Sequence, residues 1–181
     1  MRIPAPGGFT LVDLLISIGI IGALGSLVLA GISRGRMMAR STLCLANLHN
    51  ISLGLTSYTA DNSNRFPDPK SVGQSWESLI APYLNQPMVF ACPSDDEVFP
   101  SVGSSYDWRD TADPLTTLAG RPITQPIRAD AVLAFESLPG WHQRHWMNAL
   151  LVNGSAQTMN DDVCLGDLEV PVCIGVPRNQ P

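Results

Sequence analysis

Basic side chains are scarce in this sequence. Its 181 residues carry 11 lysines and arginines against 16 aspartates and glutamates, so the formal net charge is −5. Lysine occurs only at Lys70, and the seven basic residues after position 60 are scattered, without a basic run or interleaved aromatic residues. Nucleic-acid-binding proteins gather lysine and arginine on one face to contact phosphates. We therefore expect no nucleic-acid partner.

Enzymatic signatures are missing too. The sequence contains no Gly-x-Ser-x-Gly turn, no His-Glu-x-x-His helix and no glycine-rich phosphate-binding loop. Serine, histidine and aspartate all occur, but no motif orders them into a catalytic triad. We expect a structural protein rather than an enzyme, with no catalytic residues and no cofactor.

A long apolar run is what the sequence does contain. The 19 residues from Leu14 to Ile32 carry no charge, and a helix of that length spans about 30 Å of hydrocarbon. Asp13 stands at the head of the run. An acid is costly inside a bilayer, so its presence there indicates a function.

The junction ahead of the run is Gly8-Phe9, followed by Thr-Leu-Val and then Asp13. It resembles the cleavage and methylation signal of type IV prepilins and type II secretion pseudopilins, which read Gly, then Phe-Thr-Leu-x-Glu and an apolar helix. The resemblance implies that a prepilin peptidase cuts between Gly8 and Phe9 and methylates the Phe9 amine. It also implies that Asp13, in place of the usual glutamate, pairs with the Phe9 amine of a neighbouring subunit during assembly.

This resemblance and the residue pattern divide the chain into four parts. Residues 1–8 form a leader, residues 9–33 a transmembrane helix, residues 34–60 an amphipathic helix, and residues 61–181 a small β-rich globular domain. We expect a single pass of the inner membrane before assembly, with the domain outside the cytoplasm, and a periplasmic or cell-surface filament afterwards.

The charges that flank the run point to the opposite topology. Arg34, Arg36 and Arg40 follow it, whereas only Arg2 and the free amine precede it. The positive-inside rule alone would therefore place the C-terminal domain in the cytoplasm. We give the prepilin signal precedence because it covers several specific positions, whereas charge bias is statistical.

Helical periodicity continues beyond the run. One stripe contains Met37, Cys44, Leu48, Ile51, Leu55 and Tyr58. The pattern predicts one helix from about Phe9 to Ala60, whose second half covers a globular domain.

The rest of the chain predicts a small sheet. Apolar runs at 131–135 and 149–152 read as strands, and an Asn153-Gly154 turn leads to a returning strand at 157–159. The expected fold is α+β, a long helix packed on a small antiparallel sheet, which is the lollipop shape of pilins.

Several motifs extend the resemblance past the signal. They look like elements of the pilin-like proteins of planctomycetes: a "C..NL…Y…FP" run, a "CPSD" segment with a Ser-Tyr after it, and a C-terminal His…Asn-Val-Leu…Asp-Gly element. The matching residues are Cys44, Asn47-Leu48, Tyr58, Phe66-Pro67, Cys92 to Asp95, Ser105-Tyr106, His145, Asn148-Ala149-Leu150 and Asn153-Gly154. In the last element Asn153 replaces the usual aspartate, and His145 is about two residues too close.

The four cysteines are Cys44, Cys92, Cys164 and Cys173. None has the Cys-x-x-Cys spacing typical of zinc sites. The exported location that the resemblance implies is oxidising, where an even cysteine count favours disulfides. We expect Cys44 to bridge Cys92 and Cys164 to bridge Cys173, with free buried thiols as the alternative and no metal site.

Two polar clusters have simple explanations. His142 and His145 form a His-x-x-His pair without a third ligand, so packing or surface positions are expected. Residues 160–162 with Asp167 could chelate structural calcium, but their spacing does not match a calcium loop. A solvated acidic turn is the expectation there.

The sequence as a whole predicts a structural subunit of a type IV pilus or a type II secretion pseudopilus. Its partners would be other copies of itself, further pilin-like subunits, the prepilin peptidase, the inner-membrane assembly platform and lipid. Two alternatives stay open. A signal peptidase I site at Val28-Leu29-Ala30 would give an ordinary exported protein. A membrane-anchored binding module would present Trp76, Trp108, Trp141 and Trp146.

Overall fold

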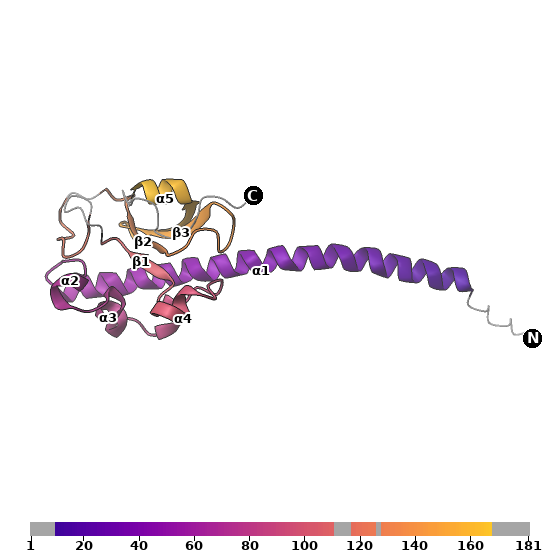
Figure 1. The fold of residues 1–181 in the computed structure, drawn as a ribbon, viewed down its shortest axis with the longest axis horizontal. Coiled ribbons are helices and arrows are strands. Elements are labelled where there is room, and N and C mark those ends of the chain that lie inside the picture. The colour runs from indigo at the N-terminus through magenta and orange to yellow at the C-terminus, as the bar shows by residue number, and fades with distance from the viewer. Residues whose placement is uncertain (1–9, 111–116, 126–127, 168–181) are drawn as a thin grey trace, which may run out of the picture. The chain divides into compact units, whose positions relative to one another are not determined.

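The computed structural model describes residues 10–110, 117–125 and 128–167. The chain forms two compact units that divide after Met38. The first unit contains the N-terminal part of α1 (Leu11–Asp61), which confirms the predicted long helix (Figure 1). Every side chain described between Leu11 and Met38 is exposed. Among the described residues, α1 is the one helix that is long and apolar enough to cross a membrane.

The second unit is built on a four-stranded antiparallel sheet in chain order. Its strands are β1 (Tyr106–Trp108), β2 (Val132–Glu136), β3 (Trp146–Leu151) and β4 (Ala156–Asn160). Strands β2 to β4 confirm the three predicted strands. Gly154, with φ of 86°, lies in the predicted turn between β3 and β4. The prediction missed β1, because three residues are too few to show an alternating pattern.

Short helices, not strands, connect α1 to the sheet. They are α2 (Pro69–Val72), α3 (Trp76–Ile80), η1 (Ala81–Tyr83), η2 (Pro87–Phe90) and α4 (Val98–Val102). Proline stands in the first turn of α2, η1 and η2, where its missing N–H is tolerated. Of the described residues in the part predicted to be β-rich, those before Gly103 therefore form short helices and loops rather than strands of the sheet.

The predicted stripe of α1 forms the centre of the core. Cys44, Leu48 and Ile51 are fully buried, and Leu55 is 3% exposed. They share one cluster with Trp76 and Ile80 of α3 and with Leu133, Ala134 and Leu150 of the sheet. Tyr58 packs at the edge of this cluster. Met37 departs from the prediction, because it lies in the first unit and is 44% exposed.

A second cluster contains Val132, Phe135, Met147, Ala149, Leu151 and Cys164. Cys164 belongs to α5 (Asp161–Asp167), which contacts β3 and β4. Figure 1 shows α5 and the C-terminal part of α1 on opposite sides of the sheet. The domain therefore has three layers, and the sheet is the middle one.

Candidate functional site

Of the predicted signal residues, Asp13 is described, whereas Gly8 and Phe9 lie outside the described residues. Asp13 Oδ2 accepts hydrogen bonds from the backbone N–H of Thr10 at 3.1 Å and from its hydroxyl at 2.7 Å. The backbone N–H of Asp13 donates in return to Thr10 Oγ1 at 3.2 Å. These reciprocal bonds form a capping box that satisfies amides at the start of α1. Asp13 thus has a local structural role, and its assembly role stays a prediction.

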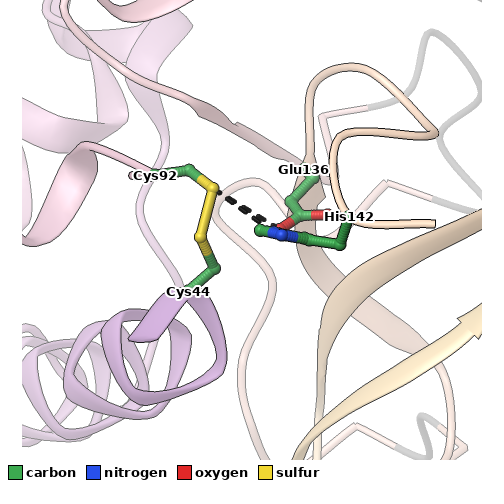
Figure 2. A group of neighbouring side chains, drawn as sticks. All are labelled: Cys44, Cys92, Glu136 and His142. Carbon is green, nitrogen blue, oxygen red and sulfur yellow. Dashed lines mark hydrogen bonds and ion pairs between the residues drawn. A yellow bond between two sulfur atoms is a disulfide. The ribbon is translucent and has the colours of Figure 1, made fainter. Parts of the chain in front are cut away.

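Cys44 of α1 and Cys92, which follows η2, form a disulfide with Cα atoms 5.3 Å apart (Figure 2). This is the predicted pairing. Cys92 is held in place on both sides: its backbone N–H donates to Ser105 Oγ at 2.9 Å, and the preceding carbonyl of Ala91 accepts from Asn47 Nδ2 at 2.9 Å. Cys164 is fully buried. Its predicted partner Cys173 lies outside the described residues, so that pairing stays a prediction.

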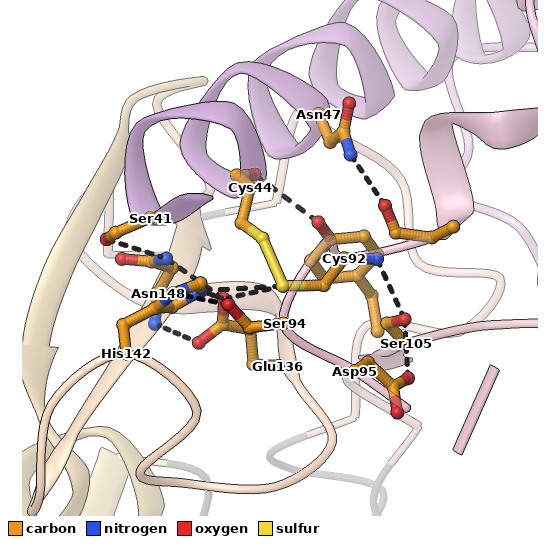
Figure 3. Close-up of a disulfide and its surroundings, with 12 residues drawn as sticks. Ser41, Cys44, Asn47, Cys92, Ser94, Asp95, Ser105, Glu136, His142 and Asn148 are labelled. Atoms are coloured by element: carbon orange, nitrogen blue, oxygen red, sulfur yellow. Dashed lines mark hydrogen bonds and ion pairs between the residues drawn. A yellow bond between two sulfur atoms is a disulfide. The ribbon is translucent and has the colours of Figure 1, made fainter. Parts of the chain in front are cut away.

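A buried carboxylate lies beside the disulfide. Glu136, at the end of β2, is fully buried. Its Oε1 lies 3.0 Å from His142 Nε2 and accepts from Asn148 Nδ2 at 2.9 Å, while its Oε2 accepts from the Asn148 backbone N–H at 2.9 Å (Figure 3). A buried carboxylate without partners would be strongly destabilising. These three donors compensate for its loss of hydration.

His142 connects this carboxylate to the loop after Cys92. The histidine is 6% exposed. Its Nδ1 lies 3.2 Å from Ser94 Oγ, on the opposite side of the ring from Glu136. Both contacts are satisfied when Nε2–H donates to Glu136 and Nδ1 accepts from the hydroxyl.

Asn148 lies in β3 and connects this strand to three other elements. Its Oδ1 accepts from the Thr158 hydroxyl of β4 at 2.7 Å, and its Nδ2 lies 3.4 Å from Ser41 Oγ of α1. With its two bonds to Glu136, the side chain and backbone of Asn148 join β2, β3, β4 and α1 through buried polar contacts. Such a network fixes the register of these elements against one another.

Asp95 orders the loop between Cys92 and α4. Its carboxylate accepts from the Ser105 hydroxyl at 2.6 Å and from the backbone amides of Glu97, Val98 and Phe99. Burial alone would raise the pKa of the Asp95 carboxyl, but these hydrogen bonds outweigh burial and lower it. Tyr106 donates its hydroxyl to the carbonyl of Cys44 at 3.4 Å, and burial raises the pKa of that hydroxyl.

Several of the motif residues that are scattered in the sequence therefore meet in one place. Cys44, Asn47, the segment from Cys92 to Asp95, Ser105-Tyr106 and Asn148 all lie around the disulfide (Figure 3). The arrangement joins α1 to the loops and the sheet of the same domain.

The two histidines of the His-x-x-His pair lie in different surroundings. His142 occupies the buried position, whereas the side chain of His145 is 64% exposed and lies 3.6 Å from an Asp161 oxygen. His142 thus has a packing position and His145 a surface position, which are the two kinds of position expected for this pair. Glu136 was not predicted as a site residue, because a glutamate at the end of an apolar run resembles an ordinary strand boundary.

The acidic segment at 160–162 begins α5. The backbone N–H of Asp162 donates to Asn160 Oδ1 at 3.0 Å and to Asp161 Oδ1 at 2.9 Å. Side-chain oxygens at this position satisfy amides at a helix start. Calcium binding by these residues with Asp167 stays untested, because the side chain of Asp167 is not described.

The chain matches no protein-family model, no curated protein and no solved structure. The pilin-like resemblance therefore rests on the residues and motifs themselves.

Proposed function

We propose that this chain is a structural subunit of a pilin-like filament, either a type IV pilus or a type II secretion pseudopilus. The observation that supports this proposal most directly is the exposed apolar surface on the N-terminal part of α1. Large apolar side chains from Leu11 to Ile32 are 44–75% exposed, and the carboxylate of Asp13 stands at their head. Exposed apolar surface of this extent requires lipid or another protein surface to cover it. A subunit that moves from the membrane into a helical filament has both.

The disulfide supports a location for the domain. Structural disulfides form and persist in oxidising compartments and are rare in the cytoplasm. Cys44 and Cys92 are bonded within the second unit. A domain outside the cytoplasm fits the topology that the prepilin signal implies. We give the disulfide and the signal together more weight than the charge bias around the apolar run, which favours the opposite topology.

The exported-protein alternative has one observation in its favour. Residues from Ala39 onward form a compact unit of their own, and the core clusters of that unit contain no residue before Cys44. Cleavage after Ala30 would leave this unit intact. The binding-module alternative loses two of its four tryptophans, because Trp76 and Trp108 are each 7% exposed and stack on each other in the core, whereas Trp146 is 38% exposed.

The mass of the mature N-terminus separates these possibilities. The chain is expressed in cells that contain a prepilin peptidase and is analysed by intact mass and N-terminal peptide sequencing. We expect a chain that begins with N-methylated Phe9. A chain that begins at Gly31 would establish the exported alternative, and an unmodified chain that begins at Met1 would refute prepilin processing.

The assembly role of Asp13 needs variants that separate charge from capping. Asp13→Asn keeps an oxygen for the capping box but removes the charge, whereas Thr10→Val removes the capping hydroxyl but keeps the charge. We expect sheared-filament yield to collapse for Asp13→Asn and to persist for Thr10→Val and Asp13→Glu, with membrane fractionation unchanged in all three. Normal yield from Asp13→Asn together with loss from Thr10→Val would show that Asp13 is only a helix cap.

A further inference from the structure

We propose that the reduced chain binds one zinc ion through Cys44, Cys92, Glu136 and His142. All four residues are buried, and each offers one ligand atom within 4.8 Å of the others (Figure 2). They come from α1, the loop after η2, the end of β2 and the β2–β3 loop. The site does not depend on the filament role proposed above.

Three of the ligand atoms lie within about 0.4 Å of the spacing of a tetrahedral site. Zinc bonds of about 2.3 Å to sulfur and about 2.0–2.2 Å to nitrogen or oxygen place sulfur about 3.6 Å from either, and nitrogen about 3.4 Å from oxygen. Cys92 Sγ lies 3.4 Å from His142 Nε2 and 3.9 Å from Glu136 Oε1. The nitrogen and the oxygen are 3.0 Å apart. Small side-chain shifts would bring all three into contact with one ion.

The fourth ligand requires reduction. In one tetrahedral site two thiolate sulfurs lie about 3.8 Å apart, so Cys44 can serve only when the disulfide is open. Two thiolates, an imidazole and a carboxylate form a donor set that suits zinc better than harder divalent cations. Oxidation by the disulfide of an exchange partner would take two electrons from the thiolates, join the two sulfurs and release Zn²⁺. The partner's S–S bond breaks to give two thiolates, which take up two protons from solvent.

Neighbouring polar groups form hydrogen bonds with the histidine and the glutamate, as the groups around the ligands do at known metal sites. Metal-bound histidines almost always donate their second N–H to a neighbour, and bound carboxylates are themselves hydrogen-bonded. With the metal on Nε2, the histidine proton resides on Nδ1 and is donated to Ser94 Oγ, at the 3.2 Å contact already present. Glu136 keeps its two bonds from Asn148.

The test uses the full chain in detergent micelles, reduced with a phosphine under anaerobic conditions and compared with the oxidised chain. The probes are Zn²⁺, quantified after gel filtration, and Co²⁺, followed by its thiolate charge-transfer and tetrahedral ligand-field absorption. We expect close to one zinc ion per reduced chain and none in the oxidised chain, because oxidation removes both thiolates. A reduced chain that retains no zinc would overturn the proposal.

Variants identify the ligands. His142→Ala and Glu136→Gln should each abolish retention of zinc, and His142→Cys should raise the thiolate charge-transfer absorption of the cobalt form by adding a sulfur ligand. Ser94→Ala, at a half-buried position, should weaken binding about 10–100-fold, as loss of an outer partner does. This variant decides the question if a ligand variant fails to fold.

Matched controls complete the experiment. His145→Asn changes the exposed histidine in the same loop and should leave zinc binding unchanged. The double variant Cys164→Ser/Cys173→Ser should also retain the ion. Zinc binding that survives both His142→Ala and Glu136→Gln would refute this site. Zinc binding that is lost in Cys164→Ser/Cys173→Ser but kept in the two ligand variants would refute it as well.

Discussion

Opening the Cys44–Cys92 disulfide should destabilise the second unit by about 4 kcal/mol. The two cysteines are separated by 48 positions, and closing a loop of that length removes about 14 cal/mol/K of entropy from the unfolded chain. The native geometry should change little on reduction. Cys44 stays within α1, and the Cys92 backbone keeps its bond to Ser105. Most of the entropic effect should therefore appear in the free energy of unfolding.

The assay is urea unfolding in detergent, with and without reductant, in the presence of a chelator. The fluorescence of Trp76 and Trp108 reports on the core, because both are 7% exposed. The variant Cys164→Ser/Cys173→Ser serves as the control, since it isolates the effect of the bond between the other two cysteines. With the chelator omitted, zinc added to this reduced variant should restore part of the loss by mass action. A loss below about 1 kcal/mol on reduction would refute the loop-entropy argument.

Three further predictions concern single residues. Gly8→Glu should block processing, because the peptidase site accommodates a small residue there; an unchanged mature mass in cells with the peptidase would contradict the prepilin assignment. Asp95→Asn should lower the free energy of unfolding at neutral pH, and the difference from wild type should vanish as the pH falls below 3.8 and through the lowered pKa of the folded Asp95 carboxyl. A difference that is independent of pH between 2 and 7 would show that the charge of Asp95 is not involved. Glu136→Gln should cost roughly 3 kcal/mol, because one of its donors must then face an NH₂ group; urea unfolding of the oxidised chain measures this, and a change within 0.5 kcal/mol would contradict the hydrogen-bonding scheme.

The periodic parts of the fold could be predicted residue by residue. The spacing of 4, 3, 4 and 3 positions from Cys44 to Tyr58 follows from 3.6 residues per turn, and the stripe indeed faces the core. The same spacing failed at Met37, because periodicity identifies a face of a helix and not the point at which the globular domain begins to cover it. Strand β1 escaped prediction because it depends on pairing with β2 rather than on a pattern of its own.

Glu136 and His142 could not be predicted as neighbours of the disulfide. Cys92 and His142 are 50 positions apart, and their contact depends on strand pairing and on the course of the β2–β3 loop. Gly140 and His145 both have positive φ in that loop, 91° and 62°. These turns decide which histidine faces inward, and no spacing rule contains that information. The even cysteine count favoured disulfides without choosing among the three possible pairings. The pairing of Cys44 with Cys92 was predicted from the place of Cys44 on the buried stripe of the helix and of Cys92 in a loop before a proline, and the structure contains this bond.

The sequence separations around the disulfide also set an order of events during synthesis. Ribosomes deliver a chain from its N-terminus at about 5–20 residues per second. His142 follows Cys92 by 50 positions, so at that speed it emerges about 2.5–10 s after the second cysteine. A chain that is oxidised within this interval fixes the loop to α1 before the sheet exists, and β2 to β4 then fold against a template that is already cross-linked. A chain that is kept reduced until His142 has emerged instead assembles the complete set of four ligands. The timing of oxidation relative to elongation would then decide which cross-link, covalent or metallic, the domain acquires first.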